Sequence, residues 1–318
     1  MEQFVFEVSA EESGQRIDKA LAKRLDEAIE TGFSRKKTKK LLDANEVRRN
    51  GRVERIASRR LQVGDKVQVR VNPDVVGSPK SHKKFNLSPD EILWEDEFVI
   101  AIDKPSGLPS QKTRDPRRDH AVAAVRRYLK WRGDDDPYVA LHHRLDVGTS
   151  GVLLFARDRR ANKGLADAFQ QRTIRKTYRA VSRSTEQSQR RDEGDRWAVD
   201  NHLASSTSGG GGRQQAVQSG GDFARTEFEI CERTGSVHHI VARPQTGRRH
   251  QIRVHLADEG LPIVGDERYG GAAQWDGKEV ERMMLHAQRL VLSHPVRDSV
   301  IDITSPVPHE FQVRGADL

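Results

Sequence analysis

The chain has 318 residues and a mass of 35.9 kDa, enough for two domains. Charged residues make up 32% of it and hydrophobic residues 35%, a composition that argues against wholesale disorder. The longest nearly apolar run, residues 147–156, is far shorter than the roughly 20 residues of a membrane span, which excludes a transmembrane protein. The N-terminus lacks the pattern of a secretion signal, and the single cysteine, Cys231, rules out an intrachain disulfide, so we expect a cytoplasmic protein.

The positive charge is concentrated in one segment. The chain as a whole carries a net charge of +8. Eleven basic and three acidic residues lie between Ser34 and Arg60, so this segment alone accounts for the whole excess. Dense Lys and Arg clusters neutralise phosphates, and the segment therefore predicts a module that binds nucleic acid. The alternative is a solvated charged surface.

Residues 1–72 have the pattern of one small α/β unit. Ser34 is a candidate N-cap, Asn45 can end a helix in left-handed geometry, and Asn50-Gly51 is a strong hairpin turn. In chain order we expect a strand, two helices and a closing strand, over residues 4–8, 16–28, 35–44 and 66–71.

This order of elements, with the strings RIDKAL, SRKKTKKLL, VRRNG and VGDKV, resembles the S-four type RNA-binding domain of many RNA-modifying enzymes. One departure is Asn45, which stands where that family usually has glycine. The resemblance implies that the basic helix and the turn lie against RNA. The residues implied in RNA binding are Arg35, Lys36, Lys39, Lys40, Arg48 and Arg49.

The rest of the chain predicts a linker and a second domain. Residues 73–89 are rich in Pro, Ser, Gly and Lys and have no apolar periodicity, so we expect a linker there. Residues 90–318 mix strand and helix patterns without regular alternation, which favours an α+β domain with a mixed sheet. Within it, residues 184–222 have a Ser/Gly core of low complexity, so we expect a mobile insertion.

Several kinds of chemistry find no motif in the sequence. The sequence has no P-loop pattern G-x-x-x-x-G-K-[ST], no dinucleotide-binding pattern G-x-G-x-x-G after a strand, and no Cys-x-x-Cys. The histidine pairs do not have the spacing of a helical zinc pair, so we expect no metal site.

Residues 142–156 combine a polar loop with a buried strand. His, Arg, Asp, Thr, Ser and two glycines lead directly into Val-Leu-Leu-Phe-Ala. A loop anchored in this way is rigidly placed, as a catalytic group requires. Taken alone, the string Arg-Leu-Asp also fits a structural pair in which Asp146 bonds Arg144 and caps a turn.

The longer string HRLDxxTSG resembles the active-site motif of the RluA-type pseudouridine synthases. Other strings of that family occur in the same order, and with the N-terminal unit they cover nearly the whole chain. In residues 221–226 (GDFART), Asp222 stands where the family has lysine, so the resemblance does not extend to RNA contacts made there. The further matching strings are residues 103–107 (DKPSG), 176–180 (KTYRA), 246–256 (TGRRHQIRVHL), 262–266 with 269–270 (PIVGD, YG) and 285–287 with 294–295 (LHA, HP).

The resemblance implies isomerisation of specific uridines to pseudouridine in structured RNA, with large-subunit ribosomal RNA as the expected substrate and tRNA as an alternative. Asp146 would attack the sugar or remove its proton, a choice that the sequence leaves open. Arg253 would keep Asp146 ionised. Tyr178 would stack on the uracil and is also a candidate to accept a proton late in the reaction. Arg144 would enter the space left by a flipped base, while Arg248 and Arg249 would contact phosphates.

Taken singly, Arg253 also fits a phosphate contact and Tyr178 a core tyrosine. The reaction is redox neutral and needs no energy input, so no cofactor is expected. We expect a monomer. Two other functions stay open: a non-catalytic RNA-binding or ribosome-assembly factor on the same scaffold, and an RNA glycosidase, which would normally need a second carboxylate.

Overall fold

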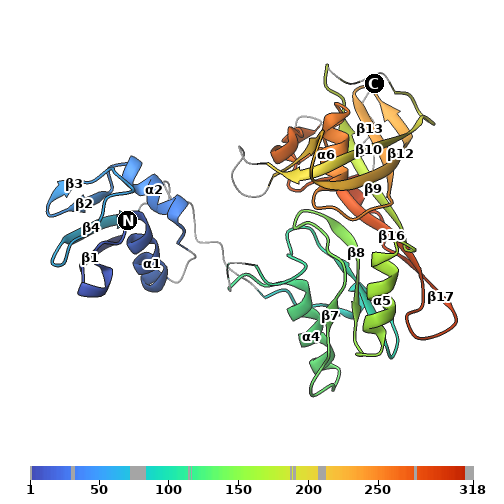
Figure 1. Cartoon of the computed structure of the whole chain (residues 1–318), viewed down its shortest axis with the longest axis horizontal. Helices are drawn as coiled ribbons and strands as arrows, with labels where there is room; N and C mark the ends of the chain where they lie inside the picture. The colour runs from blue at the N-terminus through green and yellow to red at the C-terminus, as the bar shows by residue number, and fades with distance from the viewer. Residues whose placement is uncertain are drawn as a thin grey trace. The chain divides into compact units, whose positions relative to one another are not determined.

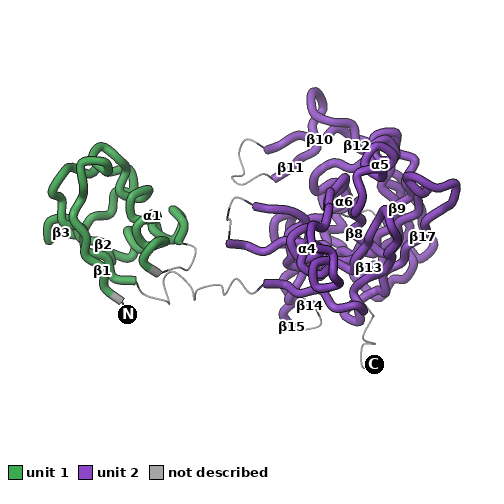
Figure 2. Tube along the Cα trace, turned by 90° about the horizontal axis from the view of Figure 1, so that it is seen from below, with its two compact units in different colours: residues 1–83 green, residues 84–318 purple. Residues whose placement is uncertain are grey.

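The computed structural model forms two compact units, residues 1–83 and 84–318 (Figure 2). Of the expected linker over residues 73–89, residues 73–83 lie outside the described part of the chain. The remainder belongs to the second unit, because Phe85 and Leu87 pack into one of its hydrophobic clusters. The structure describes residues 2–29, 33–71, 84–113, 115, 117–186, 188, 191–206, 213–275 and 278–311.

The first unit is a four-stranded sheet with two helices that share its core. The sheet has the order β1-β4-β2-β3. Leucines of both helices and alternate valines of β4 fill one buried cluster, since the apolar residues recur every second position in the strand and every third or fourth in the helices. The elements are β1 (Glu2–Glu7), η1 (Ala10–Glu12), α1 (Ile17–Ile29), α2 (Arg35–Asp43), β2 (Val47–Arg49), β3 (Arg52–Val53) and β4 (Lys66–Val71).

The local signals in this unit are confirmed. Ser34 accepts a hydrogen bond from the backbone N–H of Lys37 at the start of α2. Asn45, just after the helix, has φ of 64°. Asn50 and Gly51 both have positive φ, as the tight turn between β2 and β3 requires.

The second unit is built on a mixed sheet of eleven strands (Figure 1). Its main path runs β11-β10-β12-β13-β9-β16-β8-β6-β5, with β17 paired to β16 and β7 to β8. The β16–β8 pair is parallel, which confirms the mixed α+β class. The strands are β5 (Ile92–Glu95), β6 (Val99–Lys104), β7 (Ala140–Leu141), β8 (Ser150–Ala156), β9 (Arg175–Arg183), β10 (Arg196–Ser205), β11 (Gln214–Val217), β12 (Asp222–Thr234), β13 (Val237–Pro244), β16 (Leu285–Ser293) and β17 (Val300–Thr304), with β14 (Gln274–Trp275) and β15 (Lys278–Glu279) as a separate ribbon.

Strand β8 is buried along its whole length. Leu153 and Phe155 share a hydrophobic cluster with helix α4, while Val152 and Leu154 share another with helix α5. Both faces of the strand are therefore covered, which explains its unbroken apolar run. The helices are α4 (Ala121–Trp131), α5 (Ala161–Gln170) and α6 (Gln251–Asp258), with short turns η2 (Pro89–Glu91), η3 (Glu267–Tyr269) and η4 (His309–Phe311).

The structure differs from the expected mobile insertion over residues 184–222. Strand β10 pairs with β12 over eight positions and with β11 over four, which extends the sheet. The sequence alone did not indicate these strands, because Trp197 and Val199 of β10 pack against a cluster built from residues later in the chain, including those of β12 and α6. The glycine run at 209–212 lies outside the described residues.

Among the residues that the structure describes, no helix has both the length and the apolar character needed to cross a bilayer.

Candidate active site

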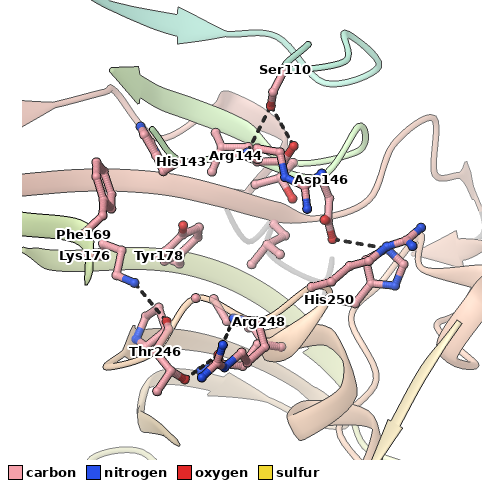
Figure 3. A pocket seen from close by; sticks show the side chains of 18 of the residues that line it. Ser110, His143, Arg144, Asp146, Phe169, Lys176, Tyr178, Thr246, Arg248 and His250 are labelled. Carbon is pink, nitrogen blue, oxygen red and sulfur yellow. Dashed lines mark hydrogen bonds and ion pairs between the residues drawn. The ribbon is translucent and has the colours of Figure 1, made fainter. Parts of the chain in front are cut away.

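A cavity of about 1400 Å³ opens in the second unit between the end of β7, strand β9 and the start of α6. Six of the residues singled out from the sequence line it, although they lie far apart along the chain (Figure 3). The structure thus gathers the separate motif strings around one space. The six are Arg144, Asp146, Tyr178, Arg248, Arg249 and Arg253.

The loop that carries Asp146 is fixed by hydrogen bonds to a neighbouring loop. The Ser110 hydroxyl bonds both the N–H and the C=O of Leu145, at 3.0 and 2.8 Å. Ser106 donates to the carbonyl of Gly148 at 2.8 Å, and the Gly107 N–H donates to that of Val147 at 2.7 Å. The backbone on both sides of Asp146 is therefore held, which places its carboxylate without using it.

The loop then enters β8 through Gly151, which has φ of 106°. A Cβ atom at this position would lie 2.2 Å from the carbonyl oxygen of Ala287 on β16. Only glycine allows this close approach, and it fixes where the loop leaves the sheet.

Lys104 lies under these two loops and is completely buried. Its ammonium donates to the carbonyls of Pro105 and Leu108, both at 2.8 Å. Burial, with a smaller contribution from the nearby Arg282, lowers the pKa of Lys104 to about 7. The neutral amine still satisfies both carbonyls.

Replacing Lys104 by Met is expected to destabilise the second unit by about 1–3 kcal/mol, because two buried carbonyls lose their donor. The loss should grow as the pH rises from 7 toward 10. Between these pH values the lysine is largely neutral in the folded protein and protonated in the unfolded chain. The free energy of unfolding of the wild type therefore rises by at most about 1.4 kcal/mol per pH unit, whereas that of the variant does not gain this contribution. All four tryptophans (94, 131, 197 and 275) belong to the second unit, so denaturation followed by tryptophan fluorescence reports it directly. A difference that does not vary with pH would contradict a lowered lysine pKa.

Arg253, on α6, bridges two carboxylates. Its Nη1 donates to Asp146 Oδ2 at 2.9 Å. Its Nε and Nη2 bond both oxygens of Asp266, at 2.6 and 2.7 Å. The Asp266 side chain is 1% exposed, so its charge is compensated inside the protein and the guanidinium is held in one orientation. The pairing of Asp146 with Arg144 that the short string allowed is not observed.

Tyr178 lies on β9 and lines the same cavity. Its ring also packs against two of the hydrophobic clusters, so the core interpretation holds for part of its surface. Burial and, to a smaller degree, the Asp146 carboxylate raise the pKa of the Tyr178 hydroxyl well above its usual value. The residue is therefore a neutral phenol at physiological pH.

The segment before α6 is shaped by one buried amide. Gln251 accepts from the Thr246 hydroxyl at 2.6 Å and from the Arg248 N–H at 2.9 Å, and it donates to the Thr226 hydroxyl at 2.9 Å. Arg248 also donates to the carbonyl of Phe223 at 3.0 Å. The motif string thus builds a rigid turn that presents its arginines at the cavity.

The arginines of this turn differ in their surroundings. Arg248 lies 3.5 Å from Asp222, which stands in the place of the family's lysine. Arg249 is exposed, as is Arg144 across the cavity, and neither forms an ion pair among the described residues. Two cations therefore remain available to an anionic ligand.

The basic residues of the first unit fall into two groups. Arg35 lies 2.8 Å from the Asp18 carboxylate, and Arg49 lies 2.8 Å from that of Asp65. Both acids are buried, so these arginines are engaged in structural pairs, which the sequence did not indicate. Arg48 is exposed and bonds only the carbonyl of Gly51.

Lys36, Lys39 and Lys40 form the second group. All three are exposed on α2 and make no ion pair among the described residues. Binding a phosphate would therefore not require these three lysines to give up an ion pair within the described residues.

Three residues of the site were not singled out from the sequence: Asp266, Tyr269 and His250. Asp266 and Tyr269 belong to strings that were noted only for their order. Tyr269 packs its ring against the Arg253 guanidinium, 4.9 Å away, and its hydroxyl bonds His250 Nδ1 at 2.7 Å. The sequence showed only that ionisable and aromatic side chains occur in the matched strings. It did not show which of these side chains contact one another.

Comparison with known proteins decides the family. Residues 98–258 match the family model described as RNA pseudouridylate synthase. The chain belongs to this family. It is 33% identical to the ribosomal large subunit pseudouridine synthase C of Yersinia pestis, covering 96% of this chain and 92% of that protein. Identity to the corresponding D enzyme of Xanthomonas campestris pv. campestris is 30%, over 94% of this chain and 88% of the relative.

Among solved structures, human RNA Pseudouridylate Synthase Domain Containing 4 matches with a TM-score of 0.54 at 23% identity, over 70% of this chain and 90% of that one. This likeness supports the catalytic fold alone. The family and the relatives together confirm that the protein is an RNA pseudouridine synthase, an isomerase that acts on RNA.

Proposed function

We propose that this enzyme converts specific uridines of large-subunit ribosomal RNA to pseudouridine, with Asp146, Arg253 and Tyr178 as its catalytic residues. The observation that carries the assignment is the Arg253–Asp146 ion pair of 2.9 Å at the wall of the cavity. The substrate class is supported by relatives that are named for the large ribosomal subunit.

Asp146 acts through its Oδ1 atom. Its Oδ2 is occupied by Arg253, whereas Oδ1 has no hydrogen bond or ion pair among the described residues. A carboxylate held by one oxygen presents the other to the substrate. Oδ1 either attacks the sugar carbon that bears the base or removes the proton of the neighbouring carbon, and both routes break the bond to the base nitrogen.

Tyr178 stacks on the uracil while the base is detached from the sugar. A planar ring beside the reacting carboxylate keeps the freed base in the cavity and lets it turn. Its raised pKa supports this role over that of a proton acceptor, because a base would require the scarce phenolate form.

Arg144 fills the space that the extruded uridine leaves in the RNA. Extrusion costs a few kcal/mol of lost stacking and pairing. Arg144 is exposed two residues before Asp146, so it lies beside the position from which the base departs. Phosphate contacts of Arg248 and Arg249 offset part of the cost.

The first unit holds the RNA through the exposed face of α2. Replacing Lys36, Lys39 and Lys40 together by Ala is expected to weaken RNA binding and to reduce the dependence of log Kd on log salt by about 2, because each phosphate contact contributes about 0.7–0.9. A filter-binding titration at several salt concentrations measures both effects. The matched control replaces Lys19 and Lys23, exposed on the neighbouring helix α1. Unchanged affinity in the triple variant would show that α2 has another role.

The substrate assignment is tested by offering the enzyme unmodified large-subunit ribosomal RNA and unmodified tRNA. Carbodiimide labelling and primer extension then locate pseudouridine. We expect product in the ribosomal RNA, whereas product in tRNA alone would overturn the assignment. Binding without product in either RNA would favour a ribosome-assembly factor, a function against which the assembled cavity argues. We further propose that the enzyme acts as a monomer in the cytoplasm.

A further inference from the structure

His250 occupies a strained position at the mouth of the cavity. It precedes α6 with φ of 56° and ψ of 18°, in the left-handed region that residues other than glycine seldom adopt. The conformation costs free energy, and its side chain is 8% exposed. Such strain persists where the surroundings hold it, and it clusters at functional sites. Here it turns the imidazole toward Asp146 (Figure 3).

The hydrogen bonds of Tyr269 determine which ring nitrogen of His250 carries the proton. The Tyr269 hydroxyl accepts from the backbone N–H of Gln214 at 2.8 Å, and it lies 2.7 Å from His250 Nδ1. Tyr269 is buried, and among the described residues no other acceptor bonds its hydroxyl proton. The proton is therefore donated to Nδ1, which leaves the imidazole hydrogen on Nε2.

Nε2 faces the reacting carboxylate without bonding it. It lies 3.9 Å from Asp146 Oδ2, beyond hydrogen-bond distance, while Arg253 occupies that oxygen. No described residue accepts a hydrogen bond from Nε2, although His250 lines the cavity. Burial, partly offset by Asp146, lowers the pKa of His250 to about 4, so the ring is neutral and does not compete with Arg253 as a counter-ion.

We propose that His250 is a further catalytic residue whose Nε2–H donates a hydrogen bond to the uracil O2 atom of the flipped uridine. This rests on the assignment of Asp146 as the reacting carboxylate. By either route of Asp146, the electron pair of the bond from sugar to base passes to the ring nitrogen N1. The resulting negative charge spreads onto O2, the carbonyl oxygen next to that nitrogen. No proton is transferred, because a preorganised donor stabilises the charge as it develops. Tyr269 is a positioning residue that fixes the tautomer.

Two amide substitutions separate the two ring nitrogens. In His250→Asn the amide nitrogen replaces Nδ1, and in His250→Gln it replaces Nε2. Asparagine also tolerates left-handed geometry, so His250→Asn keeps the turn. Under single-turnover conditions we expect His250→Asn to be about 100-fold slower with unchanged RNA affinity, and His250→Gln to stay within about 10-fold of the wild type. A wild-type rate for His250→Asn, or equal losses in both variants, would overturn the proposal.

The acceptor atom is tested with RNA that carries 2-thiouridine at the target position, because sulfur accepts hydrogen bonds weakly. The ratio of wild-type to His250→Asn rates should shrink toward one on this RNA, and an undiminished ratio would contradict O2 as the acceptor. Nitrogen NMR of the labelled enzyme should report a hydrogen on Nε2 of His250 and a mixture of tautomers in Tyr269→Phe. A hydrogen on Nδ1 in the wild type would overturn the role of Tyr269. An active Asp146→Asn enzyme would instead remove the proposed function itself.

Discussion

Asp146→Asn should lose pseudouridine formation by about 10⁴-fold or more while binding RNA as tightly as the wild type. Asparagine has the same shape and keeps an oxygen for Arg253, so the loop and α6 stay in place. It cannot attack a sugar carbon or take a proton from one, since the amide is neither nucleophilic nor basic. Carbodiimide labelling measures product, and filter binding measures affinity.

The matched control is Asp167→Asn on α5, a partly exposed carboxylate whose ion pair among the described residues is with Lys163, and it should leave the rate unchanged. Residual activity of Asp146→Asn near that of the control would contradict the assignment. Release of free uracil by the wild type would point to a glycosidase instead.

Arg253→Met is expected to be nearly inactive and also less stable. It leaves Asp266 buried without its cation, and breaking a buried ion pair in this way costs about 3–5 kcal/mol. It also frees Asp146 from the bond that orients it. Tryptophan fluorescence during denaturation measures the stability of the second unit, and single-turnover labelling measures the rate.

Adding Asp266→Asn to Arg253→Met separates the two roles of the arginine. The double variant no longer buries an uncompensated charge, so it should recover most of the lost stability yet remain inactive. Recovery of activity together with stability would show that Arg253 only supports the fold. The stability and the rate of Arg253→Lys should lie between those of the wild type and Arg253→Met. One ammonium cannot bond both carboxylates as the planar guanidinium does.

The proposed catalytic residues could be singled out from the sequence because each lies in a contiguous motif string. Asp146 lies four residues before a strand that is buried along its whole length, and such an anchored polar residue is visible in the sequence. The helix cap at Ser34 and the turn at Asn50-Gly51 were equally local signals.

Pairings between distant segments could not be predicted in the same way. Asp266 is 120 residues from Asp146, and only the fold brings both to Arg253. The same holds for Arg35 and Arg49, whose buried acids lie in other elements. Strand β10 was missed because its polar alternate residues face solvent, and its apolar ones are covered by residues elsewhere in the chain.

The burial of β8 affects how readily the loop that carries Asp146 opens by local fluctuation. Both faces of this strand are covered, and its edges pair with β6 and β16. Amides in such a strand exchange with solvent only when the domain opens globally, while surface loops exchange through local fluctuations. Because Asp146 precedes β8 by four residues and its loop is bonded on both sides, we expect this loop to open less readily than loops that lack such bonds. The base can therefore turn within a site that is anchored to a fully buried strand.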